Sequence, residues 1–264
     1  QYFREIVTWI KDQEKERGWP EIVFNSSDEL SNIGPAAVDA GVAILRAFNE
    51  IRGNRPWRTV ASVNGPQERK LLPHISIIMP NSAYPITVES LKEIHANNVD
   101  LWIYNIGNSR ATWGFYPWRV GAKARYQWFN CQVRGDPWSA FDGDTGYMTT
   151  QITPGKPLAS PDLMEIGEGL NDLRYIKTLE NWIEKAKAQS LNQNAIEAAI
   201  AAQKDLDSIK QAIPVDPRAF LGEISAQAAG VPTKGELANH TRLDEWRLKI
   251  ATHIMNIENN LHPQ

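Results

Sequence analysis

The amino-acid sequence predicts an α/β protein with a parallel β-sheet, followed by a helical C-terminal region. Short apolar segments alternate with amphipathic segments up to about residue 135, at the spacing of repeated strand–helix units. After Pro161 the pattern is almost wholly helical. The chain has 264 residues, of which 42% are hydrophobic, so it is long and apolar enough to bury a large core.

The individual elements follow from the spacing of apolar residues and from the glycines and prolines between them. Helical spacing predicts helices in the first half at 2–17, 35–52, 67–72, 87–97 and 115–123. Short apolar and aromatic runs predict strands at 21–24, 57–63, 75–79, 101–104 and 126–131. Turn-forming residues dominate 135–162, where we expect irregular structure, and later helices are expected at 164–188, 194–212 and 243–259.

About five strands precede residue 135, which is roughly half the complement of a (β/α)8 barrel of the TIM type. We therefore expect the C-terminal half of such a barrel in residues 1–185 and a helical tail in 186–264. An open, doubly wound sheet is the alternative. Because the chain starts at Gln1 inside a helical pattern, we expect a preceding segment or a partner chain to complete the barrel.

Composition and motifs argue against several classes of function. The formal net charge is -3 and no long block of like charge occurs, so we expect neither a nucleic-acid nor a membrane partner. The single cysteine, Cys131, cannot form an internal disulfide. The five histidines are scattered without metal-ligand spacing, and no Gly-rich phosphate loop follows a strand. We therefore expect no metal and no cofactor.

The polar segment from Asn25 to Glu29 follows the first expected strand directly. In a parallel barrel the carboxyl ends of the strands carry the active site, so Asp28 and Glu29 are candidate catalytic residues. A pair of carboxyl groups in that position suits acid–base chemistry at a glycosidic oxygen. The alternative is that the segment begins a helix and its side chains only cap it.

Aromatic side chains are concentrated in the same part of the chain, since eight of the ten tryptophans lie in the first 138 residues. Flat aromatic faces stack on the C–H surfaces of sugars, and Tyr and Trp add a polar group. The candidate substrate-binding residues are Tyr104, Asn105, Trp113, Tyr116 and Trp138. Core packing is the alternative for the aromatic residues, and hydrogen bonding to the loop backbone is the alternative for Tyr104 and Asn105.

A set of short motifs occurs along the expected barrel: the Asp28-Glu29 pair, Tyr104, Arg119-x-Gly121-Ala122, Trp128, Asp136-Pro137-Trp138, Gly146-Tyr147, Pro157-x-x-Ser160 and Glu168-Gly169-x-x-Asp172-x-x-Tyr175. This set resembles the catalytic domain of glycoside hydrolase family 123 and its relatives, the domain of unknown function 4091. The likeness covers roughly residues 20–180. The chain departs from the family pattern at Leu30, where the family has Pro, and at Asp162, where it has Arg.

The resemblance implies a (β/α)8 barrel that hydrolyses a β-linked N-acetylgalactosamine-like sugar with retention of configuration. It implies substrate-assisted catalysis similar to that of family 20 N-acetylhexosaminidases, in which the 2-acetamido oxygen is the nucleophile. Asp28 would then orient the acetamido group, Glu29 would be the general acid and base, and Tyr104 would hydrogen-bond the acetamido oxygen. It also implies a secreted or periplasmic location, which the sequence itself leaves open.

Two other interpretations remain open at this stage. One is a barrel that binds carbohydrate without turning it over. The other is an assembly or scaffold module, in which the helical tail packs against a partner and would expose a large apolar patch.

Overall fold

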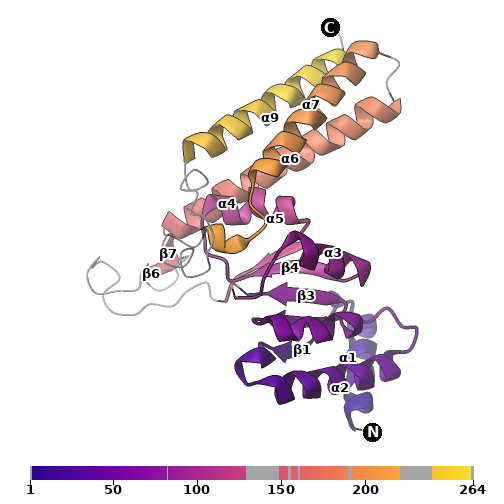
Figure 1. The fold of residues 1–264 in the computed structure, drawn as a ribbon. Helices are drawn as coiled ribbons and strands as arrows, with labels where there is room; N and C mark the ends of the chain where they lie inside the picture. Colours follow the sequence, from indigo (N-terminus) through magenta and orange to yellow (C-terminus); the bar gives the residue numbers. More distant parts are fainter. Residues whose placement is uncertain are drawn as a thin grey trace. The chain divides into compact units, whose positions relative to one another are not determined.

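The computed structural model describes residues 2–81, 83–128, 149–153, 156–159, 161–189, 192–220 and 240–262 (Figure 1). The chain forms two compact units. Unit 1 comprises residues 1–105 and 122–126, and unit 2 comprises 106–121 and 127–264. The boundary expected between residues 185 and 186 falls inside one long helix of unit 2.

Unit 1 contains a five-stranded parallel sheet, which confirms the expected α/β class. The strands lie in the order β1-β2-β3-β4-β5, so neighbours in space are neighbours along the chain. Its elements are α1 (Tyr2–Arg17), β1 (Phe24–Asp28), the 3₁₀ helix η1 (Leu30–Asn32), α2 (Pro35–Arg52), β2 (Thr59–Val63), the 3₁₀ helix η2 (Pro66–His74), β3 (Ile77–Pro80), α3 (Val88–Ala96), β4 (Asp100–Tyr104) and β5 (Ala124–Tyr126).

The first strand lies further along the chain than expected, because Ile22 hydrogen-bonds to helix α1 instead of to a strand. Its N–H donates to the carboxylate of Glu14 and its carbonyl accepts from Lys11 Nζ, each at 2.7 Å. The ladder to β2 begins only where Phe24 N–H donates to the carbonyl of Arg58, at 3.0 Å. The strand predicted at 21–24 is therefore wrong in its bounds, and Asp28 is the last residue of β1.

Both faces of the sheet are apolar, as is typical of parallel sheets. One face carries a cluster formed by Val60, Ile77, Met79 and Tyr104, with Val23 and Trp102 packed against it. The alternate residues face the other side and are also buried: Ala61, Val63, Ile78, Leu101 and Ile103. Packing on both faces fixes the register, so the strand ends are placed accurately.

Unit 2 is mainly helical, and α6, α7 and α9 lie side by side (Figure 1). The three helices expected after Pro161 are thereby confirmed. An antiparallel pair of strands, β6 with β7, stands where irregular structure was expected. The elements are α4 (Arg110–Trp113), α5 (Phe115–Val120), β6 (Thr149–Thr153), β7 (Lys156–Ala159), α6 (Pro161–Gln189), α7 (Gln193–Ala212), the 3₁₀ helix η3 (Pro217–Phe220) and α9 (His240–Leu261).

Two further corrections concern the middle of the chain. The helix expected at 115–123 is the shorter α5, which ends at Val120 because Gly121 follows it with a left-handed φ of 71°, and a separate short helix, α4, precedes it. The strand expected at 126–131 ends at Tyr126, and residues from 129 to 131 lie outside the described residues.

Glycines let α4 and α6 approach each other closely within unit 2. A Cβ atom on Gly169 would lie 2.5 Å from the carbonyl oxygen of Arg110, and one on Gly114 would lie 2.6 Å from the carbonyl oxygen of Gly169. The same contact buries the guanidinium of Arg110 against Asp172, with Nε and Oδ2 2.6 Å apart. Asp172 also accepts from Arg247 of α9 at 2.6 Å. Close backbones and a buried charge network therefore hold α4, α6 and α9 together.

We expect Gly169→Ala to lower the free energy of unfolding by about 1–3 kcal/mol, the usual cost of overpacking a filled contact. Gly167→Ala is the matched control on the same helix, since a Cβ there would meet no described atom within 4 Å. That control should be neutral or more stable by up to ~1 kcal/mol, because Ala favours helix over Gly. Urea denaturation of both variants decides the point, and equal stabilities would contradict it.

Candidate functional site

Polar side chains gather at the carboxyl edge of the unit 1 sheet, where parallel strands commonly present functional groups. Asp28 ends β1 and Tyr104 ends β4. Ser62 lies beside Asp28 in the register of β1 and β2, and Asn81 follows β3 directly. Glu29, the residue after β1, lies among them. These residues define the strand-end site discussed below.

The backbone of Glu29 adopts a left-handed conformation, with φ of 48° and ψ of 50°. For a residue with a long side chain this costs roughly 1–2 kcal/mol. Two backbone hydrogen bonds impose it: Glu29 N–H donates to the carbonyl of Ser62, and Asn32 N–H donates to the carbonyl of Glu29, both at 2.9 Å. Strain of this kind is concentrated at active sites and ligand clamps, so it marks Glu29 as a candidate functional residue.

The side chains of the acidic pair are engaged by neighbouring side chains. One carboxylate oxygen of Glu29 accepts from Asn32 Nδ2 at 2.8 Å, and the other accepts from Asn81 Nδ2. Asp28 Oδ1 accepts from the hydroxyl of Ser62 at 2.7 Å. Although Glu29 stands at the cap position of η1, its side chain makes no capping hydrogen bond. The side chain of Glu29 therefore does not cap η1.

Tyr104 lies on the same edge of the sheet as the acidic pair, at the end of β4. Burial, together with the negative charges of Glu29 and then Asp28, raises the pKa of the Tyr104 hydroxyl, while a hydrogen bond with Asn105 acts in the opposite direction. Two strands separate β1 from β4, and in a flat sheet that spacing would be about 14 Å. Tyr104 and the two carboxylates share the carboxyl edge of the sheet, so the negative charges act on the phenol across it. Asn105 also has a left-handed backbone, with φ of 52°.

The other candidate residues lie elsewhere. Tyr116 is fully buried in unit 2, and its hydroxyl donates to the carbonyl of Val215 at 2.9 Å, which gives no support to a contact with substrate. Trp113 is half-buried in α4 of the same unit, against the glycine contact with α6. Trp138 lies outside the described residues. The structure thus brings Asp28, Glu29, Tyr104 and Asn105 to one edge.

Sequence reasoning missed the asparagines around Glu29. Asn32, Asn64 and Asn81 come from the loops after β1, β2 and β3, respectively. The available signal was their position, since each of the last two follows an apolar strand directly. That signal is weak, because Asn is common in turns and the partners of these two amides are far away in sequence.

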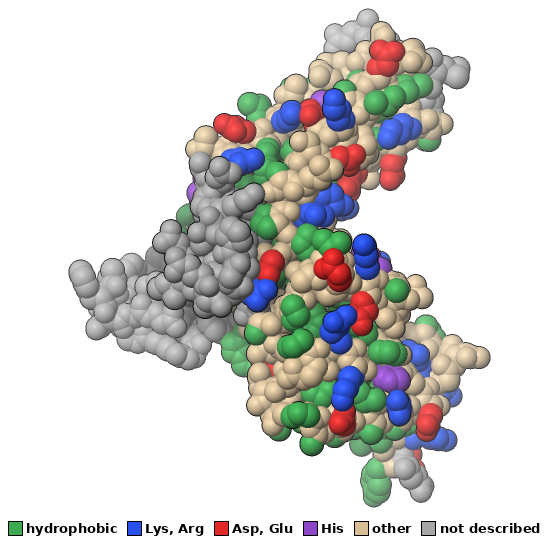
Figure 2. Space-filling view, in the orientation of Figure 1, with side chains coloured by type: hydrophobic (Ala, Val, Ile, Leu, Met, Phe, Trp, Pro, Cys, Tyr) green, Lys and Arg blue, Asp and Glu red, His purple; other side chains and the backbone are tan. Residues whose placement is uncertain are grey.

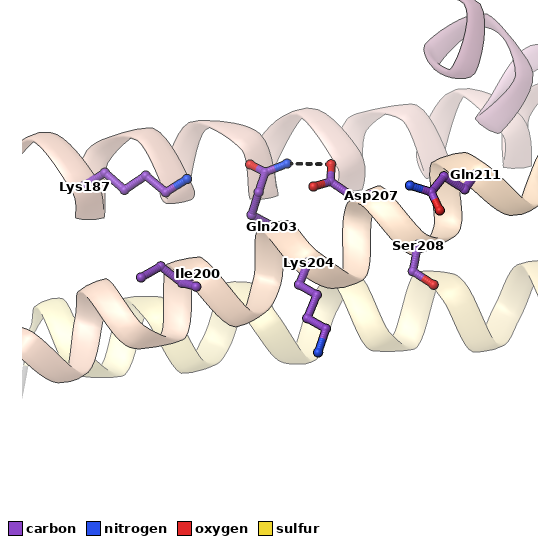
Figure 3. A pocket seen from close by; sticks show the side chains of 7 residues that line it. All are labelled: Lys187, Ile200, Gln203, Lys204, Asp207, Ser208 and Gln211. Carbon is purple, nitrogen blue, oxygen red and sulfur yellow. Dashed lines mark hydrogen bonds between the residues drawn. The ribbon is translucent and has the colours of Figure 1, made fainter.

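Two hollows in the described part of the chain are lined by residues other than those of the strand-end site. One, of about 480 Å³, is lined by Lys187 of α6 and by side chains of α7 (Figure 3). Gln203 Nε2 donates a hydrogen bond to Asp207 Oδ1 there, at 3.0 Å, and Lys204 points away from both (Figure 3). The other lies between α2 and η2, around Arg46 and His74. Neither brings together groups with evident chemistry.

The described residues give no sign of a metal or a membrane-spanning helix. No group of three His, Cys, Asp or Glu side chains among them is placed to hold a metal ion. None of their helices is long and apolar enough to cross a bilayer. On the face drawn in Figure 2, basic and acidic side chains are interspersed, as on an ordinary solvated surface.

Comparison with known proteins adds no family assignment: neither the models of protein families nor the curated proteins contain a match to this chain.

We expect the pKa of Tyr104 to fall when either neighbouring carboxylate is neutralised, because a tyrosinate then forms beside less negative charge. Glu29→Gln should lower it more than Asp28→Asn, since Glu29 contributes more. Asp39→Asn, an exposed change on α2, is the control and should leave it unchanged. Titration of protein labelled with ¹³C at the tyrosine ring measures this, with Tyr104→Phe giving the assignment. If the pKa of Tyr104 is the same in these variants, the carboxylates of Glu29 and Asp28 do not act on its hydroxyl, which would contradict the prediction.

Proposed function

We propose that this protein is a glycoside hydrolase that cleaves a β-linked 2-acetamido sugar, N-acetylgalactosamine-like, by substrate-assisted catalysis with retention of configuration. The observation that carries the proposal is the environment of Glu29. Its backbone is strained, its carboxylate accepts from two side-chain amides instead of capping a helix, and Asp28 and Tyr104 lie on the same edge of the sheet. The resemblance of the Asp28-Glu29 motif to family 123 enzymes supports the same chemistry.

In this proposal the acetamido carbonyl oxygen of the sugar attacks C1, while Glu29 donates its proton to the glycosidic oxygen. The bond from C1 to that oxygen breaks, and its electron pair stays with the leaving alcohol. Water then opens the cyclic intermediate at C1 and returns a proton to Glu29. Two displacements at C1 retain the configuration, so no distant carboxylate nucleophile is required.

Asp28 and Tyr104 take the remaining parts of this mechanism. The carboxylate of Asp28 accepts the acetamido N–H, which turns the carbonyl oxygen toward C1 and stabilises the positive charge that develops on the nitrogen. The hydroxyl of Tyr104 donates to the acetamido oxygen, and Asn105 holds that hydroxyl in place. Each group is then set at the geometry in which attack is fast.

We also propose that the sheet is part of a (β/α)8 barrel. The strand order follows the sequence without reversal, whereas a doubly wound sheet reverses its order at a switch point. Among the described residues, β1 pairs with β2 and with no strand on its other side. On the adjoining helix α1, Tyr2, Ile6 and Trp9 are each more than half exposed. These features favour a further segment or a partner chain that packs beside β1 and completes the barrel.

A carbohydrate-binding protein without turnover is the second candidate. The exposed aromatic rings of Tyr126 and Trp128 favour it, since 54% and 65% of their surfaces are open to stacking on a sugar. The same strand-end residues would then bind the acetamido group without protonating the leaving oxygen.

We expect Glu29→Gln to reduce hydrolysis of an aryl N-acetyl-β-galactosaminide by about 10²–10⁴-fold, the usual contribution of a general acid. Binding of N-acetylgalactosamine, measured by calorimetry, should survive. Asp28→Asn should also reduce the rate heavily, because the acetamido group is no longer oriented. Asp39→Asn is the surface control. Equal rates in the wild type and Glu29→Gln would contradict the mechanism, and binding without hydrolysis in every variant would favour the second candidate.

A further inference from the structure

We propose that Asn32, Asn64 and Asn81 are positioning residues for Glu29, an inference that rests on the proposed function of Glu29 as general acid. They come from three successive loops at the carboxyl edge of the sheet. Asn32 and Asn81 each donate to a different oxygen of the Glu29 carboxylate, and Asn64 donates to Asn32. We refer to these residues as the asparagine clamp.

Asn64 fixes the direction in which the Asn32 amide points. An amide side chain has a donor end and an acceptor end, and turning it over exchanges the two. Asn64 Nδ2 donates to Asn32 Oδ1 at 3.1 Å, which commits the acceptor end of Asn32. The donor end of Asn32 is thereby directed to Glu29, 2.8 Å away. Without Asn64, the Asn32 amide is free to turn its oxygen toward the carboxylate and repel it.

A buried carboxylate holds Asn64 in turn. Glu68 of η2 is fully buried, and its Oε2 accepts from the backbone N–H groups of Asn64 and Gly65, at 2.7 and 2.9 Å. These bonds fix the loop after β2. The clamp therefore runs from a buried, rigid anchor to the strand end, although Asn32 itself is exposed.

The clamp has a defined effect on proton transfer. The last torsion of a Glu side chain is broad, so a free carboxyl group rotates. Donors on both oxygens restrict that rotation and direct the carboxyl group toward one position of the leaving oxygen. The same N–H groups face the oxygens that hold negative charge once the proton has passed to the leaving alcohol. Loss of a clamp residue should therefore slow only steps that need the acid.

The test compares two substrates whose leaving groups differ in their need for a proton from Glu29. A dinitrophenolate leaving group departs from the sugar without being protonated, whereas a phenolate leaving group needs a proton from the general acid. Asn81→Ala and Asn64→Ala should each lower kcat on the phenyl substrate by about tenfold, the effect of a lost hydrogen bond, and leave kcat on the dinitrophenyl substrate nearly unchanged. Asp28→Asn should slow both substrates alike, which separates orientation of the acetamido group from acid catalysis.

Asn49→Ala is the matched control for general damage. Asn49 is a half-buried residue of α2 whose amide donates to the carbonyl of His74 at 3.0 Å, away from the site. It should leave the ratio of the two rates unchanged. If Asn81→Ala and Asn64→Ala behave like this control, the clamp has no part in catalysis.

Side-chain amide signals in ¹⁵N NMR spectra test the clamp independently of turnover. Asn64→Ala should shift the Asn32 amide signals, and Glu29→Gln should shift those of both Asn32 and Asn81, whereas Asn49→Ala should shift none of them. If the wild type hydrolyses neither substrate, the proposed function fails, and these shifts still decide whether the clamp exists. Unmoved signals would overturn it.

Discussion

The hydrogen bond from Glu29 N–H to the carbonyl of Ser62 is the contact on which the strand-end site depends. It is the last bond between β1 and β2, and it holds Glu29 against the sheet at the point where the chain must turn into η1. At this turn Glu29 adopts a left-handed backbone conformation, which glycine adopts more readily than other residues. The carboxylate consequently lies between Asn32 of η1 and Asn81 of the loop after β3, and accepts from both side-chain amides.

Unit 2 depends on a comparable constraint of a different kind. The guanidinium of Arg110 and the carboxylate of Asp172 are both shielded from water, and neither charge would be tolerated without the other. The glycines at 114 and 169 bring the two backbones close enough for this pair to form. Gly169 and Asp172 stand three residues apart in α6, so the close approach of the backbones and the buried ion pair lie on the same side of that helix.

Sequence reasoning predicted the parallel α/β class, the long helices and the Asp28–Glu29 pair as a feature at a strand end. These follow from local signals, namely periodicity and the residues between elements. It misplaced β1, because the apolar residues Ile22 and Val23 are typical of a strand. The hydrogen bonds between α1 and Ile22 depend on the tertiary structure, so the pattern of neighbouring residues does not predict them.

The asparagines, and Tyr116 in unit 2, show that a sequence does not reveal contacts between residues far apart along the chain. The partners of Asn81 and Asn64 are 52 and 32 residues away, so their role was invisible in the sequence. Tyr116 lay close to other aromatic residues in sequence and was grouped with them, yet its hydroxyl is bonded to a residue 99 positions away. Proximity along the chain is a poor guide to which side chains share a site, whereas the shared edge of a parallel sheet is a good one.

The polar composition of β1 lowers its contribution to the stability of the sheet. The other long strands of the sheet are rich in Val, Ile and Leu, whereas β1 reads Phe-Asn-Ser-Ser-Asp. Its pairing is interrupted between Asn25 and Ser27, where Asn25 Oδ1 accepts from the N–H of Ser27 at 3.3 Å. The hydroxyl of Ser27 is buried without a hydrogen-bond partner among the described residues. Such a strand contributes less to stability than an apolar one.

A strand of this kind is retained where its polar groups have a use that packing cannot supply. Pairing resumes after the interruption, so that Asp28 lies opposite Ser62 and its carboxylate accepts from the Ser62 hydroxyl. An apolar replacement of β1 would strengthen the sheet, but it would remove Asp28 and this hydrogen bond. The weakness of β1 as a strand and the geometry of the strand-end site therefore have the same physical origin.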